Sequence, residues 1–144
     1  MAKEPAFSLS GLSIWIDGRQ FPGSNDYWDA NWLNLRVQMQ AEGATVKCSG
    51  AILMTTDFER FRSDLRELHK NLKGYAQLAG HEPELKLILT AEQLGQINVA
   101  VEVTPDHLSQ FHRFELGLDQ SYLPGLLHSL DRILVEFPVL HAEN

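Results

Sequence analysis

The chain has 144 residues, of which 44% are hydrophobic and 22% charged, so it can bury a hydrophobic core without disulfides or metals. We expect one domain over residues 1–144, with frayed ends at 1–7 and 140–144. Twelve Lys and Arg against 19 Asp and Glu give a net charge of −7, which disfavours a nucleic-acid ligand and suits a basic protein partner.

The N-terminus has no signal-peptide pattern, and the one cysteine, Cys48, cannot form an internal disulfide. No apolar run reaches the roughly 18 residues that a membrane span needs. The sequence therefore predicts a cytoplasmic protein that does not contact a membrane.

The first half of the chain contains three alternating segments, which are typical of half-buried strands. They cover Leu12–Ile16, Leu33–Met39 and Ala44–Cys48, and the last two are joined as a hairpin by Ala41-Glu42-Gly43. The turn formers from Phe21 to about Asn31 predict an irregular surface loop. Cys48 alternates in phase with Val46, so its thiol is expected to face the core.

A helix is predicted from Thr56, because Thr56 and Glu59 form a capping box at a helix start. Apolar residues then recur at spacings of three and four, with charged residues on the opposite face. Gly74 is the expected end, since glycine readily adopts the left-handed conformation.

The second half contains three more alternating segments, Leu85–Leu89, Ile97–Val103 and Phe114–Leu118. A final helix is expected from Asp119 or Ser121 as N-cap to Pro138, with a wide apolar face. Its apolar residues are Tyr122, Leu123, Leu126, Leu127, Leu130, Ile133, Leu134 and Phe137.

Six strands and two helices without a regular strand and helix alternation predict an α+β fold. We expect a mainly antiparallel sheet of about six strands with both amphipathic helices packed on it.

The sequence contains no pattern that indicates catalysis. The six histidines lack the paired spacing of a metal site, and nucleotide-binding, serine-nucleophile and zinc-protease motifs are missing. We therefore expect a protein that is not an enzyme and that needs no cofactor or metal.

The segment Asp26-Tyr27-Trp28-Asp29-Ala30-Asn31-Trp32 combines three aromatic side chains with two carboxylates. Asp26, Tyr27, Trp28 and Asp29 are our candidates for a partner-binding site, because aromatic anchors dominate protein interfaces and carboxylates can meet Arg or Lys. The alternative is that Trp28 and Trp32 cover the core while Asp29 and Asn31 make local turn hydrogen bonds.

The order of the segments resembles the WapI-like bacterial immunity proteins. The resemblance rests on Asp29-Ala30-Asn31-Trp32-Leu33 opening a strand, on the central capped helix, on Asp119-Gln120-Ser121-Tyr122-Leu123 opening the final helix, and on Phe137-Pro138-Val139 closing it. It implies a protein that binds and neutralises a cognate toxin domain, often a nuclease with a basic cleft, and it supplies no catalytic residue.

Two other functions remain open from the residues. A small-molecule-binding or structural domain could use a pocket lined by Trp15, Trp28 and Trp32. An enzyme of an unrecognised type could assemble its site from residues far apart in the sequence.

Overall fold

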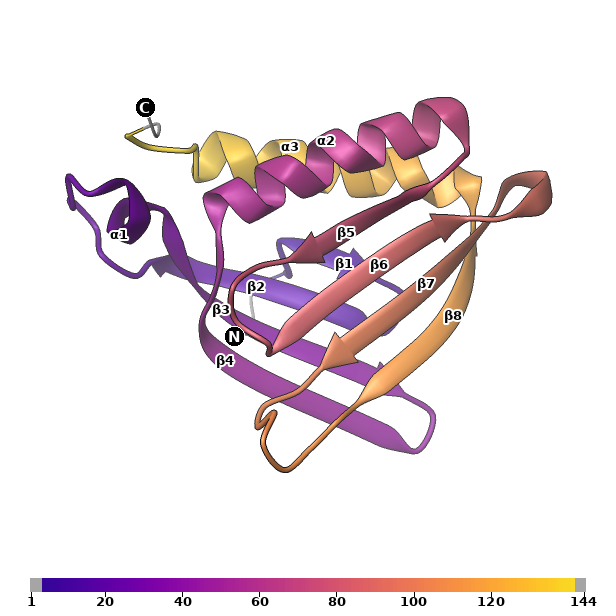
Figure 1. Cartoon of the computed structure of the whole chain (residues 1–144), viewed down its shortest axis with the longest axis horizontal. Helices are drawn as coiled ribbons and strands as arrows, with labels where there is room; N and C mark the ends of the chain where they lie inside the picture. The colour runs from indigo at the N-terminus through magenta and orange to yellow at the C-terminus, as the bar shows by residue number, and fades with distance from the viewer. Residues whose placement is uncertain (1–3, 142–144) are drawn as a thin grey trace.

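The computed structural model describes residues 4–141 and consists of two antiparallel sheets and a layer of helices (Figure 1). Each sheet has four strands, and neighbours in each sheet are neighbours in the sequence. The expected α+β class and the antiparallel pairing are confirmed.

The first sheet has the order β1-β2-β3-β4. Val37 pairs with both Ile14 and Cys48, and the side chains of Ile14 and Val37 are buried. The strands are β1 (Phe7–Leu9), β2 (Leu12–Arg19), β3 (Trp32–Ala41) and β4 (Ala44–Met54).

The second sheet has the order β5-β6-β7-β8. Leu87, which pairs with Leu78 and Val101, points into the core, while Ile88 and Glu115 lie in the alternate, outward register. The strands are β5 (Tyr75–Ala79), β6 (Leu85–Ala91), β7 (Gln96–Val103) and β8 (Arg113–Asp119).

The helices α2 (Thr55–Asn71) and α3 (Leu123–Glu136) lie side by side along one margin of both sheets (Figure 1). Helix α2 packs on β5 and helix α3 on β1, so the pair covers one edge strand of each sheet. A single cluster of buried apolar residues includes side chains from both sheets and both helices. Burial of this cluster is the main stabilising contribution to the fold.

The expectation of one sheet of about six strands is wrong in number and arrangement. Strands β1 and β5 were not predicted, because β1 has only three residues and β5 alternates with small alanines that carry a weak signal. Helix α2 follows β4, the last strand of the first sheet, and precedes β5, the first strand of the second.

The predicted loop up to Asn31 contains a short helix, α1 (Tyr27–Asn31). Its N-cap is Asp26, whose carboxylate accepts hydrogen bonds from two backbone amides of the first turn. Local capping therefore overrides the weak helical tendency of the aromatic residues in this segment.

The boundaries of α2 also differ from the prediction. The helix begins at Thr55, and the carboxylate of Asp57, not of Glu59, accepts from the backbone N–H of Met54 at 2.8 Å. It ends before Gly74, because Leu72 takes the left-handed conformation with φ 51°. Leu72 donates its backbone N–H to Leu68, which satisfies one carbonyl of the last turn.

Asp119 caps a single 3₁₀ turn, η2 (Gln120–Tyr122), and α3 begins after it at Leu123. We expected Tyr122 on the buried face of this helix, but its side chain is exposed. The helix ends at Glu136, one residue before Phe137 and close to the predicted stop at Pro138. Its buried residues are Leu123, Leu126, Leu130, Ile133 and Leu134.

The ends of the described chain make specific contacts where fraying was expected. Phe7 is buried in β1, and Leu140 is hydrogen-bonded to Asn31. The remainder of that expectation falls on 1–3 and 142–144, which lie outside the described residues. Between residues 4 and 141, no helix combines the length and apolar character of a membrane-crossing segment.

Candidate protein-binding site

The four predicted contact residues lie at the start of helix α1, where Asp26, Trp28 and Asp29 are exposed and Tyr27 is partly exposed. The Oδ1 atom of Asp26 accepts from the backbone N–H of Trp28 at 2.8 Å and of Asp29 at 3.1 Å. Asp26 therefore acts first as a structural cap, while the side chain of Asp29 is exposed and makes no such cap.

The indole of Trp28 contacts two other rings although it is 47% exposed. The centroid of the Tyr27 ring lies 5.3 Å from it and that of the His81 ring 5.8 Å, both in edge-to-face arrangements. Such contacts restrict the side chain without covering it. Trp28 is therefore a partly exposed aromatic group with a defined position.

The backbone of α1 is fixed to distant segments by two polar side chains, the buried Asn31 and the partly exposed Arg19. The amide nitrogen of Asn31 donates to the carbonyls of Tyr27 (2.7 Å) and Leu140 (2.8 Å). Arg19 donates to the carbonyls of Ala30 (2.8 Å) and Pro138 (2.6 Å). These bonds connect α1 with β2 and the C-terminal segment. They therefore hold in place the backbone that carries the exposed aromatic side chains.

The charges around α1 are mixed. An open hollow beside Tyr27 is lined on the α2 side by Arg60, Arg62 and Arg66, together with Glu59 and Asp64. On the other side, His81 and Glu82 belong to the connection between β5 and β6. The carboxylates of Asp26 and Asp29 therefore do not lie in a uniformly acidic surface.

His81 is the residue of this site that sequence reasoning missed. It lies more than 50 positions after Trp28 in the chain. No local pattern links the two residues, because their contact depends on how β5 and β6 pair beside α1. Trp32 was included in the aromatic segment, but it begins β3 and pairs with Met54 instead.

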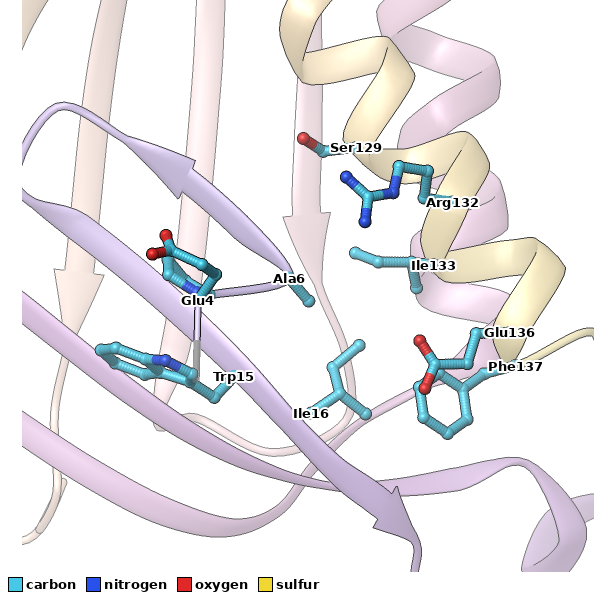
Figure 2. A pocket seen from close by; sticks show the side chains of 10 residues that line it. Glu4, Ala6, Trp15, Ile16, Ser129, Arg132, Ile133, Glu136 and Phe137 are labelled. Atoms are coloured by element: carbon cyan, nitrogen blue, oxygen red, sulfur yellow. The ribbon is translucent and has the colours of Figure 1, made fainter. Parts of the chain in front are cut away.

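A cavity of about 300 Å³ lies elsewhere, between β2, α3 and the segment before β1. Figure 2 shows Arg132 and Glu136 projecting from α3 toward it, opposite Trp15 and Ile16. Trp15 is the one tryptophan that lines this cavity, so the cavity does not unite the three tryptophans of the predicted ligand pocket. Glu4, Arg132 and Glu136 give it a charged rim, unlike the mainly apolar sites typical of small-molecule ligands.

The charged side chains of the described region form no recognisable metal centre. Between residues 4 and 141, no group of three or more His, Cys, Asp and Glu side chains is arranged to hold an ion. The buried carboxyl of Asp57 is bonded to the backbone of Met54 and to Arg60 (3.4 Å). Burial raises the pKa of Asp57, and these hydrogen bonds and the charges of Arg60 and His81 oppose that rise.

Comparison with known proteins gives the family. A family model described as the immunity protein WapI-like family matches residues 7–138. The chain belongs to the immunity protein WapI-like family. The family match confirms the resemblance that the sequence suggested. The protein is therefore a toxin-neutralising immunity protein.

No curated protein matches the sequence of this immunity protein. Among solved structures, a chain of the CdiA-CT/CdiI toxin and immunity complex from Enterobacter cloacae is similar to it with 14% sequence identity and a TM-score of 0.48. The similarity covers 84% of this chain and 99% of that one.

Proposed function

We propose that this immunity protein neutralises its toxin by binding a basic surface of the toxin domain, without catalysing a reaction, and that the toxin is a nuclease. Membership of the immunity protein family is the observation that carries this proposal. The net charge of −7 supports it, because a nuclease binds its phosphate-rich substrate through basic groups that an acidic inhibitor can cover.

Tyr27, Trp28, Asp26 and Asp29 of the α1 region form part of the contact in this proposal. Trp28 is exposed and fixed by Tyr27 and His81, so its burial by a partner costs little conformational entropy. A rigid aromatic group of this kind is a common centre of binding energy.

The test of the electrostatic part uses the toxin domain encoded beside this protein, inactivated by mutation, in stopped-flow or surface-based kinetics. Association should slow as salt rises from about 50 to about 500 mM, since ions screen attraction between opposite charges. Asp29→Lys should slow it further. Asp26→Asn removes the charge while leaving an oxygen that can cap α1, so it separates charge from folding.

Trp28→Ala should increase the dissociation rate constant by a larger factor than it changes the association rate constant. The reason is that a desolvated aromatic anchor acts after the two proteins have met. Val135→Ala is the control, because Val135 is an exposed apolar residue on α3. Binding unaffected by salt, by Asp29→Lys and by Trp28→Ala would remove the α1 surface from the proposal. No binding of the wild-type protein to the neighbouring toxin domain would remove the proposed partner.

A further inference from the structure

The excess negative charge of this immunity protein is concentrated on the second sheet. Residues 74–122, which contain β5 to β8 and their connections, carry seven carboxylates and two cationic side chains. The helices α2 and α3 together carry six carboxylates and five cationic side chains, which nearly cancel. Most of the net charge of −7 therefore belongs to one part of the molecule.

The cationic side chains of the second sheet do not cancel this excess. Arg113 forms ion pairs with Glu102 at 2.7 Å and with Glu115 at 3.2 Å, in a row that crosses the outer face of β7 and β8. Glu82 and Glu92 are exposed in the connections on either side of β6. On the outer face of the strands, Lys86 and Arg113 nearly balance Glu102, Glu115 and Asp119. Most of the excess negative charge therefore lies in the connections at the ends of the sheet.

Two other exposed carboxylates at the ends of the sheet are held in the ionised form. Hydrogen bonding by Ser109 lowers the pKa of Asp106, and hydrogen bonding by Ser121 lowers the pKa of Asp119. Asp106 follows β7 and Asp119 ends β8, so both ends of the sheet carry a negative charge at neutral pH.

The same part of the chain also exposes large apolar side chains. Five of the eight large hydrophobic residues that are exposed in the described region lie within residues 75–122. Leu94 is 96% exposed at the turn between β6 and β7, and Phe111 is 70% exposed in the connection between β7 and β8. The other three are Tyr75, Leu108 and Tyr122. Exposed apolar groups at both ends of a sheet with carboxylate-rich connections offer a basic partner both apolar and charged contacts.

This face is continuous with the α1 surface. His81, which contacts the ring of Trp28, also lines an open hollow of about 350 Å³ on the second sheet. Gln77, Glu82, Lys86 and Glu102 line the same hollow. A partner that contacts Trp28 can therefore extend across the hollow onto the outer face of β5 to β8 without a gap.

We propose that the toxin domain docks across the outer face of the β5–β8 sheet, where the carboxylates of the connections attract its basic surface and the exposed apolar side chains at both ends anchor it. This inference rests on the proposed function and adds the main docking surface to it. In this arrangement Glu82 and Glu92 act during encounter, whereas Phe111 and Tyr122 act in the bound complex.

The electrostatic test compares two double variants that change the total charge equally. Glu82→Lys with Glu92→Lys alters the connections of the second sheet, and Glu67→Lys with Glu136→Lys alters the exposed side of the helix pair. With the inactivated toxin domain at about 50 mM salt, the first variant should associate roughly tenfold more slowly and the second less than about twofold more slowly than wild type. Equal slowing in both variants would overturn the inference.

The anchoring test uses Phe111→Ala and Tyr122→Ala, with Val135→Ala as the exposed apolar control on α3. Dissociation should become roughly tenfold faster in each of the first two variants and remain unchanged in the control. Amide hydrogen exchange of the wild-type complex should show protection in the 105–112 and 92–96 connections and in β8, and none added in α2. Protection confined to α2 and α3 would overturn the inference even if a variant folds poorly.

The two proposals fail in different ways. If the wild-type protein does not bind the toxin domain, the proposed function is wrong. If it binds and the second-sheet variants behave like their controls, binding stands and the docking surface lies elsewhere.

Discussion

Asn31 uses its whole side-chain amide to join three segments. Its oxygen accepts from the hydroxyl of Thr55 at 2.7 Å and from the backbone N–H of Leu140 at 2.9 Å, in addition to the two bonds that its nitrogen donates. The side chain is fully buried, so no water replaces a lost partner. Asn31 therefore fixes α1, the start of α2 and the C-terminal segment together.

Asn31→Ala should lower the free energy of unfolding by about 1–3 kcal/mol, because it leaves buried donors and acceptors without partners. Urea unfolding followed by tryptophan fluorescence measures this change. Asn98→Ala, at an exposed position on β7, is the control and should change stability by less than about 0.5 kcal/mol. Equal stability of the two variants would show that the Asn31 network contributes nothing.

Cys48 is half-buried and packs against the core, as its alternation with Val46 predicted. Burial, with a smaller effect of the nearby Glu84 carboxylate, raises the pKa of the Cys48 thiol to about 11. The neutral thiol is thus favoured in the folded protein, and stability from this group is lost as the pH rises from the unfolded value of about 8.5 toward 11.

Iodoacetamide should therefore modify Cys48 much more slowly in the folded protein than in urea. At pH 7.5 the difference in thiolate fraction alone gives a rate ratio of roughly 300. The folded rate should keep increasing with pH above 9, where an ordinary thiol approaches its plateau. Mass spectrometry of timed samples measures both rates, and similar rates at pH 7.5 would contradict the raised pKa.

Helix α3 contributes its buried face to the region between the first sheet and α2. Leu130 is fully buried, in agreement with the apolar spacing of the sequence. Its neighbour on the polar side, Asp131, accepts from Arg66 of α2 at 3.0 Å and from Arg62 at 3.3 Å. Apolar packing therefore fixes the helix pair, and the ion pairs sit at its solvent edge, where they add little.

Leu130→Ala should lower the free energy of unfolding by about 2–5 kcal/mol, the range for truncating a buried leucine. Thermal or urea unfolding measures the effect. Leu127→Ala, at a partly buried position on the same helix, should cost less. A change below about 0.5 kcal/mol in Leu130→Ala would mean that this face of α3 is not packed.

The strands that were predicted are those with long alternating patterns, such as Leu33–Met39, because the period of two appears directly in the sequence. The short β1 and the alanine-containing β5 lack that signal. The predicted helix boundaries were wrong where the cap is unusual. Leu72 takes the left-handed conformation after α2, although Gly74 follows two residues later. Such choices depend on tertiary packing, which no local pattern contains.

The four residues of the predicted site lie together because they are adjacent in the sequence, so their proximity is no test of the prediction. The contact of Trp28 with His81 and the concentration of charge on β5–β8 could not be predicted, since both depend on which strands share a sheet. The amino-acid composition showed that the net charge is negative, but not where on the molecule the excess carboxylates lie. The family was suggested by segment order and is confirmed by the family model.

The whole molecule carries balanced charges on the helix pair, and its excess carboxylates lie on the second sheet and its connections. Such an asymmetric charge orients a basic partner before contact. In our account the protein neutralises a toxin by occupying its surface, so one molecule of immunity protein is consumed for each toxin bound.

A titration of toxin activity measures this most directly. A fixed concentration of the neighbouring toxin domain, well above the dissociation constant, is mixed with increasing immunity protein, and residual toxin activity is measured after short and long incubation. We expect a linear loss of toxin activity that ends near equimolar immunity protein and does not change with time. Complete inactivation at a small fraction of one equivalent, increasing with incubation, would contradict it, because only a catalyst could act in that way.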